Sequence, residues 1–205
     1  MIYRKIHKDK ATQPQQGVYS DWKAQISDEC YNQCVYCAIH ENHWGGLDNY
    51  HVEHFRPKSI PAFKRLENDI LNLFLACPVC NRFKSDDWPA DPDVTIPSYA
   101  DPSLNDYSTF FKVGATPYTL AGSCVSATYT IERLYLNRPQ LIYERREATL
   151  KKREIALFNE VLELAEKLQE KDLIVKTFAV IGAIKKHLDA REYIRPYKLA
   201  EIRKP

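Results

Sequence analysis

Two cysteine pairs constrain the fold of this chain more than any other feature. Each pair has two residues between its cysteines, and together they comprise Cys34, Cys37, Cys77 and Cys80. This spacing lets a tight turn direct two thiolates at one ion, and two such turns complete the closed tetrahedral shell of a structural zinc. The sequence therefore predicts that zinc joins two distant segments and holds what lies between them.

A run of possible metal ligands and proton acceptors lies between the two pairs. It reads His51-Val-Glu-His-Phe-Arg-Pro57, and Asn81 directly follows the last cysteine. A neutral imidazole is a natural general base, whereas carboxylate and amide oxygens suit a hard divalent ion such as Mg²⁺ or Mn²⁺. Adjacent side chains on a regular strand point to opposite faces, so Glu53 and His54 should face one ion only at a distortion or a strand end.

These residues resemble the zinc-containing HNH endonucleases, whose shared core is a ββα-metal finger. The resemblance covers roughly residues 30–88 and rests on both cysteine pairs with Glu53-His54, Pro57, Asn72-Leu73, Asn81 and Lys84. It implies an α+β fold in which His54 is the general base, Asn72 the middle asparagine of the motif, and Asn81 a metal ligand. Family members usually carry Asp before the base. Glu53 keeps the carboxylate, but its extra methylene moves that group by about an ångström.

A broader resemblance concerns biological role. The segments Val52-Glu-His-Phe-Arg-Pro-Lys58 and Ile131-Glu-Arg-Leu-Tyr-Leu-Asn137, with Arg145, are similar to the HNH component of Septu-type and retron-associated anti-phage systems. This resemblance implies an endonuclease that cuts nucleic acid, with DNA as the expected substrate. It also implies an antiviral role together with an ABC-like or SMC-like ATPase partner. The C-terminal helices are the candidate surface for that partner, or else an intramolecular scaffold.

Charge is distributed unevenly along the chain. The net charge is +2 overall, but +3 over residues 1–20, −6 over 21–130 and +5 over 131–205. An acidic module repels a polyanion, so phosphate affinity should come from the basic arms, from a partner, or from cations near the site. The candidates near the site are Arg56, Lys58, Arg82 and Lys84. Alternatively, the C-terminal charges form a solvated helix face, and Lys84 is a solvated helix residue.

Four segments are expected along the chain: a basic arm and lead-in (1–29), the HNH core with its zinc knuckles (30–88), a Pro/Asp-rich loop with a small hairpin (89–130) and a helical region (131–205). Within the core, residues 47–55 predict a strand, residues 71–76 a second strand or a short helical approach, and Pro78 the start of a helix. In the helical region, helical spacing relates Leu150, Leu157, Val161, Leu164, Ala165 and Leu168, and residues 173–188 predict a second helix.

Two other interpretations stay open. Cys30, Cys34 and Cys37 also match the Cys-x3-Cys-x2-Cys pattern of radical SAM enzymes, which would make Cys30 an iron–sulfur ligand. Such enzymes need many βα units, which this chain lacks, so we expect Cys30 and Cys124 to be buried thiols or bystanders. The second alternative is a zinc-knuckle module that binds nucleic acid or protein without cutting it. His51 either contacts the metal or a phosphate, or is a packed or surface residue; His40 and His43 are expected in a loop.

Composition is that of a soluble, cytoplasmic protein. The 205 residues are 44% hydrophobic, which is enough for a substantial core. Six cysteines without a signal peptide favour a reducing compartment and metal binding over disulfides. The longest apolar run near the end is interrupted by Gly182 and is too short to span a bilayer. We therefore expect a cytoplasmic location and no membrane span.

Overall fold

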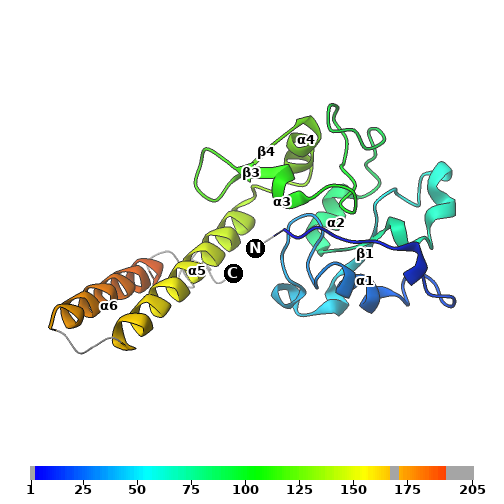
Figure 1. The fold of residues 1–205 in the computed structure, drawn as a ribbon. Coiled ribbons are helices and arrows are strands. Elements are labelled where there is room, and N and C mark those ends of the chain that lie inside the picture. Colours follow the sequence, from blue (N-terminus) through cyan, green and yellow to red (C-terminus); the bar gives the residue numbers. More distant parts are fainter. Residues whose placement is uncertain (1–2, 167–170, 193–205) are drawn as a thin grey trace, which may run out of the picture. The chain divides into compact units, whose positions relative to one another are not determined.

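The computed structural model describes residues 3–166 and 171–192. Its helices are α1 (Lys23–Glu29), α2 (Pro78–Lys84), α3 (Tyr107–Phe110), α4 (Val125–Arg133), α5 (Pro139–Glu166) and α6 (Lys171–Glu192), and its strands are β1 (His51–His54), β2 (Leu73–Ala76), β3 (Phe111–Val113) and β4 (Leu120–Gly122) (Figure 1). The chain divides into two compact units, residues 1–144 and 145–205. This arrangement confirms the expected mixture of small sheets with a helical C-terminal region.

A ββα unit forms the centre of the first compact unit. β1 pairs antiparallel with β2, with His54 opposite Leu73 and His51 opposite Ala76. β2 reads Leu-Phe-Leu-Ala and is buried along its whole length, and α1 packs against it. α2 follows β2 after one residue, Cys77, which caps the helix. The sheet therefore reaches the zinc cysteines and the start of α2 without an intervening loop.

Both strands of this sheet are shorter than the sequence pattern predicts. Residues Leu47–Asn49 form a 3-10 turn instead of strand, and the Tyr50 N–H donates to Leu47 O at 2.9 Å. Residues Ile70–Asn72 likewise form a 3-10 turn, capped by the Asp69 side chain. The local turn hydrogen bonds at each site replace ladder bonds, so pairing is confined to four residues on each strand.

One continuous core joins the segments expected before residue 131 with the start of the helical region. It includes Ile26 of α1, Tyr36, the buried residues of β2, and Leu134 and Leu141 from the end of the first unit. Residues 88–102 contain no helix or strand, as their repeated prolines predict. Tyr99 of this segment is nonetheless fully buried in the core. The predicted hairpin is present as β3 and β4, with Phe111 opposite Gly122.

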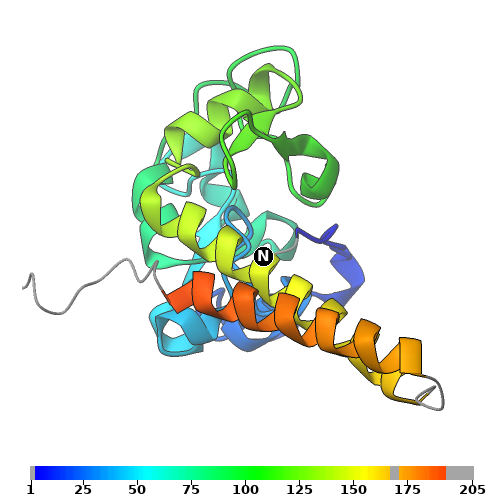
Figure 2. The same cartoon turned by 90° about the vertical axis from the view of Figure 1, so that its left-hand side faces the viewer.

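The second unit contains α5 from Arg145 onward and α6, two antiparallel helices that lie side by side in both views (Figures 1 and 2). Leu157 and Thr177 are buried, and His187 Nε2 lies 3.2 Å from Leu150 O across the pair. Of the positions predicted to form the helical stripe, Leu168 lies outside the described residues. Among the described residues no helix is both long and apolar enough to cross a membrane.

Candidate active site and metal centre

The four paired cysteines converge on one point. Their Sγ atoms all lie within 4.8 Å of one another, and Cys34, Cys37, Cys77 and Cys80 are all buried. The sulfur atoms of Cys37 and Cys77 are 3.8 Å apart. That separation is about the edge of a tetrahedron whose centre lies about 2.3 Å from each sulfur, and it is almost twice the length of a disulfide bond. The donor set and its geometry therefore fit a structural Zn²⁺.

Two backbone turns present these thiols. In the first, the Cys34 N–H donates to Ile39 O at 2.9 Å and the Ala38 N–H donates to Cys34 O at 2.8 Å, with Ala38 in the left-handed region at a φ of 55°. In the second, Cys77 caps α2, and its Sγ accepts from the Cys80 N–H at 3.4 Å. Pro78 takes the first helical position, where a missing N–H leaves no helical bond unmade.

Arg138, which immediately precedes α5, lies against the second cysteine pair. Its Nη1 and Nη2 atoms are 3.8 Å and 3.7 Å from Cys80 Sγ, and Nη1 also donates to Leu134 O. Four thiolates around one Zn²⁺ leave a net charge of about −2, which a guanidinium hydrogen-bonded to sulfur offsets. Arg138 thus contributes charge and two N–H donors to the zinc centre from a distant part of the chain.

Glu53 is held inside the protein by two partners. Its side chain is 4% exposed, and Oε1 accepts from the Tyr36 hydroxyl at 3.2 Å. The same oxygen is 2.7 Å from Lys84 Nζ, which also donates to His54 O at 3.2 Å. Burial raises the pKa of the Glu53 carboxyl, while the ion pair and hydrogen bond with Lys84 oppose that rise. Glu53 is therefore fixed in position before any metal ion binds.

The two partners of Glu53 come from the two zinc knuckles. Tyr36 lies between Cys34 and Cys37, and Lys84 is the last residue of α2, the helix that begins at the second pair. A zinc ion that joins the pairs consequently also fixes a hydroxyl and an ammonium around Glu53. This explains physically why the candidate catalytic residues lie between zinc ligands in the sequence.

His54 is the last residue of β1 and is held in one orientation. Nε2 lies 3.0 Å from Glu67 O, and the ring packs edge-to-face on Tyr19 at a centroid distance of 4.7 Å. A carbonyl oxygen can only accept, so Nε2 carries the hydrogen and Nδ1 keeps its lone pair. Burial lowers the pKa of His54, which favours the neutral imidazole at pH 7. His54 has the tautomer and charge that a general base needs.

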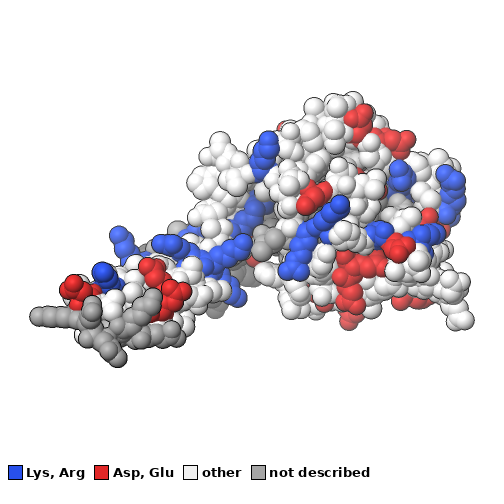
Figure 3. Space-filling model, viewed as in Figure 1, with Lys and Arg blue, Asp and Glu red and all other residues white. Residues whose placement is uncertain are grey.

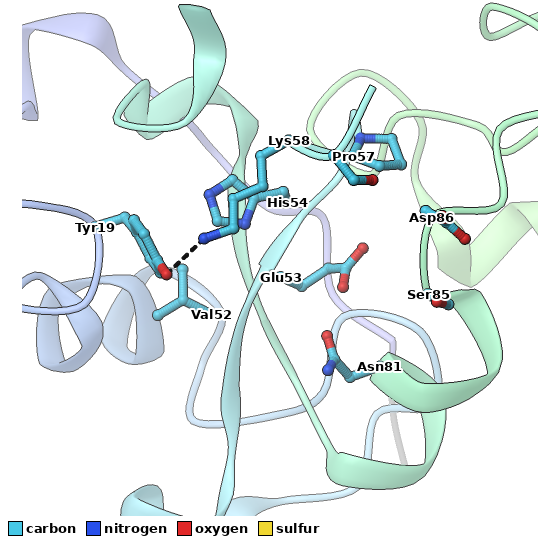
Figure 4. Close-up of a pocket in the computed structure, with 10 residues that line it drawn as sticks. Tyr19, Val52, Glu53, His54, Pro57, Lys58, Asn81, Ser85 and Asp86 are labelled. Carbon is cyan, nitrogen blue, oxygen red and sulfur yellow. Dashed lines mark hydrogen bonds between the residues drawn. The ribbon is translucent and has the colours of Figure 1, made fainter. Parts of the chain in front are cut away.

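Glu53, His54 and Asn81 line one open cavity of about 360 Å³ (Figure 4). Because β1 ends at His54, the cavity extends around the strand end and both neighbouring side chains can face it. Asn81 comes from α2, and Figure 4 shows its amide next to the Glu53 carboxylate, with Asp86 across the cavity. Asp86 follows Ser85, whose φ of 49° turns the chain at the end of α2.

Asn72 supports the loop beyond His54 and does not line this cavity. Its Oδ1 accepts from the Arg56 N–H at 2.8 Å, and its Nδ2 donates to Arg56 O at 3.1 Å and Leu66 O at 3.3 Å. The side chain is buried. Asn72 therefore extends the pairing of β1 with β2 through a side chain, and its place is that of a positioning residue.

The predicted phosphate contacts lie in three different environments. Lys58 lines the cavity, where its Nζ donates to the Tyr19 hydroxyl at 2.6 Å and to Glu67 Oε1 at 3.2 Å. Arg56 lies with its guanidinium 5.7 Å from the Trp88 ring centre, and Arg82 is exposed on α2. Lys84 is completely buried. Lys84 is expected from the sequence to be a phosphate contact or a solvated residue, and its buried position contradicts both expectations. Its ammonium group is buried because it forms an ion pair with the buried Glu53 carboxylate.

The remaining predicted ligands lie outside the cluster. Cys30 is buried, and its Sγ accepts from the Leu75 N–H at 3.3 Å; it is not part of the four-cysteine group, which contradicts the iron–sulfur interpretation. Cys124 is half-buried before α4. His51 is exposed at the start of β1 and does not line the cavity. His40 caps a short turn through Nδ1, as its predicted loop position allows.

Several residues of the site are not singled out by sequence reasoning. Tyr36 carries only the signal of an aromatic residue inside a zinc knuckle, and Tyr19 lies in the N-terminal lead-in. Asp86 and Asp87 are adjacent acids that the sequence does not distinguish. The structure separates them, because Asp87 binds the hydroxyls of Tyr99 and Tyr129 and the Arg133 guanidinium, whereas Asp86 lines the cavity.

Comparison with protein families identifies the region that holds the cysteine pairs and the cavity residues. Residues 34–87 match the HNH endonuclease family. That stretch begins at the first zinc cysteine and contains both knuckles, Glu53, His54 and Asn81. Searches of curated proteins and of solved structures found no match. Residues 34–87 are thus similar to an HNH endonuclease domain, and the four-cysteine cluster within them is suited to zinc.

Proposed function

We propose that this protein is a metal-dependent endonuclease that hydrolyses phosphodiester bonds, with DNA as its substrate and His54 as its general base. The observation that carries the proposal is the placement of His54. Its Nε2 is bound to Glu67 O, and it lines one cavity with the oxygen ligands Glu53 and Asn81. A non-catalytic zinc module would not need an imidazole fixed in this tautomer beside two metal-type ligands.

The reaction follows from the position of the imidazole. His54 Nδ1 takes a proton from water as the water oxygen bonds to phosphorus, and the bond from phosphorus to the leaving sugar oxygen breaks in line; that oxygen then takes a proton from solvent. A Mg²⁺ or Mn²⁺ ion bound in the cavity would supply a Lewis acid for the charge on the phosphate and the leaving oxygen. Burial keeps His54 neutral, so it can accept the proton near pH 7.

Glu53, Asn81 and Asp86 are the proposed ligands of this ion. Lys84 matches the charge of Glu53, and the Asn81 amide is neutral, so these groups together offer a divalent ion no net negative charge. Hard cations prefer anionic oxygens, and Asp86 provides the carboxylate in the same cavity. Glu53 Oε1 already contacts Tyr36 and Lys84, so Asp86 is the proposed source of the negative charge that the ion needs.

Substrate capture is proposed to use Lys58, Arg56 and Arg82, the three predicted cations whose ends remain at the surface. Lys58 lines the cavity itself. The antiviral role and the ATPase partner belong to the same proposal and are supported by the resemblance of residues 52–58 and 131–137 to defence nucleases. A cytoplasmic location is supported by the absence of disulfides among the six cysteines, all of which the structure describes.

Plasmid nicking with His54→Ala tests the general base. We expect the zinc-loaded variant to lose at least about a hundredfold of the Mg²⁺- or Mn²⁺-dependent activity, a typical contribution of a general base. His51→Ala, an exposed histidine on the same strand, is the matched control and should cut normally. Plasmid DNA and total RNA are compared as substrates. Wild-type cutting by His54→Ala would rule out its role, and wild-type protein that binds nucleic acid without cutting any substrate would favour the non-catalytic module.

Mn²⁺ binding tests the ligand set without depending on activity. Titration followed by electron paramagnetic resonance should show weaker binding in Asp86→Asn by about tenfold or more, since one anionic ligand is lost. Asp28→Asn, at an exposed position of α1, is the control and should bind Mn²⁺ as the wild type does. Equal affinity of Asp86→Asn and wild type would remove Asp86 from the set while leaving Glu53 and Asn81 in it.

A further inference from the structure

The α5–α6 hairpin presents a row of large apolar side chains to solvent. On α5 these are Ile155, Phe158 and Leu162, and on α6 they are Ile174, Val175, Phe178 and Ile181; each residue is between 45% and 68% exposed. Single exposed apolar residues are normal on any protein surface. Seven of them on two helices form a contiguous apolar surface of the kind that marks an interaction site.

Helical geometry places all seven on one side of the hairpin. The inward positions are set by Leu157 on α5, by Thr177 on α6, and by the contact between His187 and Leu150. We count the angle around each helix from its inward positions, looking from the N-terminus to the C-terminus. At 3.6 residues per turn, the exposed apolar residues then lie about 120° from the inward positions, in the same direction of rotation on both helices. Since the helices are antiparallel, the same sense brings both rows to the same side.

The opposite side of the hairpin has a different composition. There the positions on α5 are Arg153, Ala156, Glu160 and Glu163, and those on α6 are Asp172, Lys176, Ala179 and Ala183; all are exposed. These side chains are charged or small, as expected of a surface that stays in water. The hairpin therefore has one side adapted to solvent and one side that buries apolar area only if something packs on it.

We propose that the apolar side docks against the same side of a second copy of the chain, related by a two-fold axis. The first argument is area. At roughly 100 Å² of exposed surface per side chain, seven residues provide about 700 Å² on each copy, and two copies bury about 1,400 Å², within the range of stable specific interfaces. A two-fold interface uses the same patch on both copies, so no other surface is required.

The second argument is charge. Residues 145–153 of α5 carry five cations and one acid, a net charge of +4, whereas residues 154–166 carry four acids and no cation, a net charge of −4. α6 does not balance this separation, because residues 171–181 and 182–192 each have a net charge of +1. Figure 3 shows both basic and acidic side chains on the visible face of the hairpin formed by α5 and α6.

An antiparallel second copy matches these charges. It sets the +4 half of one α5 against the −4 half of the other, while a parallel pairing sets like charges together. Apolar area thus supplies the affinity, and the charge distribution selects the two-fold orientation. The proposal is independent of the nuclease chemistry, and its consequence is that two nuclease domains are present in one particle.

Sedimentation equilibrium of the full zinc-loaded chain tests the proposal. We expect the wild type to sediment as a dimer, and Phe158→Glu with Phe178→Glu to weaken dimerisation at least about a hundredfold, because both aromatic anchors are replaced by charge. Ala156→Glu with Ala179→Glu places the same charges on the opposite side and should remain dimeric. Circular dichroism checks that each variant is folded, and Phe178→Ser offers a milder change if the first pair loses helix.

Charge exchange tests the orientation separately. Lys151→Glu and Glu154→Lys change charges on the docking side of α5, and each variant alone should dimerise more weakly than wild type. Their mixture should form a heterodimer, because the unchanged −4 half of the first variant again faces the unchanged +4 half of the second. A wild-type chain that stays monomeric up to about 0.1 mM, well above micromolar dissociation constants, would overturn the proposal. A dimer broken by the control pair but not by the phenylalanine pair would also overturn it.

Discussion

Replacing Lys84 by Met tests whether a buried ion pair holds Glu53. Lys84 Nζ lies 2.7 Å from Glu53 Oε1, and the two side chains are 0% and 4% exposed. At this distance and an effective dielectric constant of about 20, two unit charges attract each other by about 6 kcal/mol. Methionine fills most of the lysine volume but leaves the carboxylate alone. Removing one partner of a buried pair costs about 3–5 kcal/mol.

Protonation of Glu53 limits the cost. Without Lys84, the Glu53 carboxyl takes up a proton instead of remaining charged. Its ordinary pKa is 4.5, about 2.5 units below pH 7. At about 1.4 kcal/mol per pKa unit, protonating the carboxyl at pH 7 costs about 3 kcal/mol. We therefore expect Lys84→Met to lose about 3 kcal/mol of unfolding free energy at pH 7. In the variant, the folded-state pKa of Glu53 lies above its unfolded value. Stability is therefore retained near pH 4.5 and is lost as pH rises, by up to about 1.4 kcal/mol per pH unit.

Urea unfolding of the zinc-loaded proteins between about pH 6 and 8 measures this effect as the difference from wild type. Arg82→Met, at an exposed position of the same helix, is the matched control and should change stability by less than about 0.5 kcal/mol. Glu53→Gln combined with Lys84→Met should recover much of the loss, because no buried charge remains. A loss below about 1 kcal/mol, or one that does not vary with pH, would refute the buried pair.

Three further predictions concern the zinc centre and the base. Cys77→Ser should lower zinc content and melting temperature together, because knuckle binding energy is folding energy; elemental analysis with unchanged zinc and unchanged melting would contradict the four-ligand set. Arg138→Met should keep zinc but speed its transfer to a coloured chelator by about tenfold, as two N–H donors leave Cys80 Sγ; an equal transfer rate would deny the guanidinium that role. The acid limb of the nicking profile should have its midpoint below pH 6.5, because burial lowers the pKa of His54 and a protonated imidazole cannot accept a proton; a midpoint above 6.5 would exclude His54 as the base.

Much of the candidate site follows from local sequence patterns. The Cys-x2-Cys spacing predicts the four ligands, because two residues are what a tight turn needs to bring two thiols to one ion. Four of the predicted residues, Glu53, His54, Asn81 and Lys58, line the same cavity. The expected strand end at Glu53 and His54 is where β1 stops. Such features depend on residues only a few positions apart, so they can be recognised from the sequence before the tertiary structure is known.

Whether a charged side chain is buried, and which groups it contacts, depends on residues that are distant in the sequence. Lys84 has the sequence appearance of an exposed helix residue, but the end of α2 packs onto Glu53, and the carboxylate there makes burial of the ammonium favourable. Asp86 and Asp87 are adjacent, and only the approach of Tyr99, Tyr129 and Arg133 assigns Asp87 to a structural network. In the same way, helical spacing predicts α5 and α6 but not which of their apolar residues remain in water.

By itself, the sequence determined which residues can bind metal and how the chain passes from knuckle to strand to helix, because spacing and periodicity act over single turns and strands. The tertiary structure decided which of the charged residues meet. It placed Tyr36 and Lys84 on Glu53, turned His54 Nε2 to Glu67 O, and brought Arg138 to Cys80. The physical reason is that burying a charge or a hydrogen-bonding group is favourable only where its partner is also buried, and partners far apart in sequence meet only in the fold.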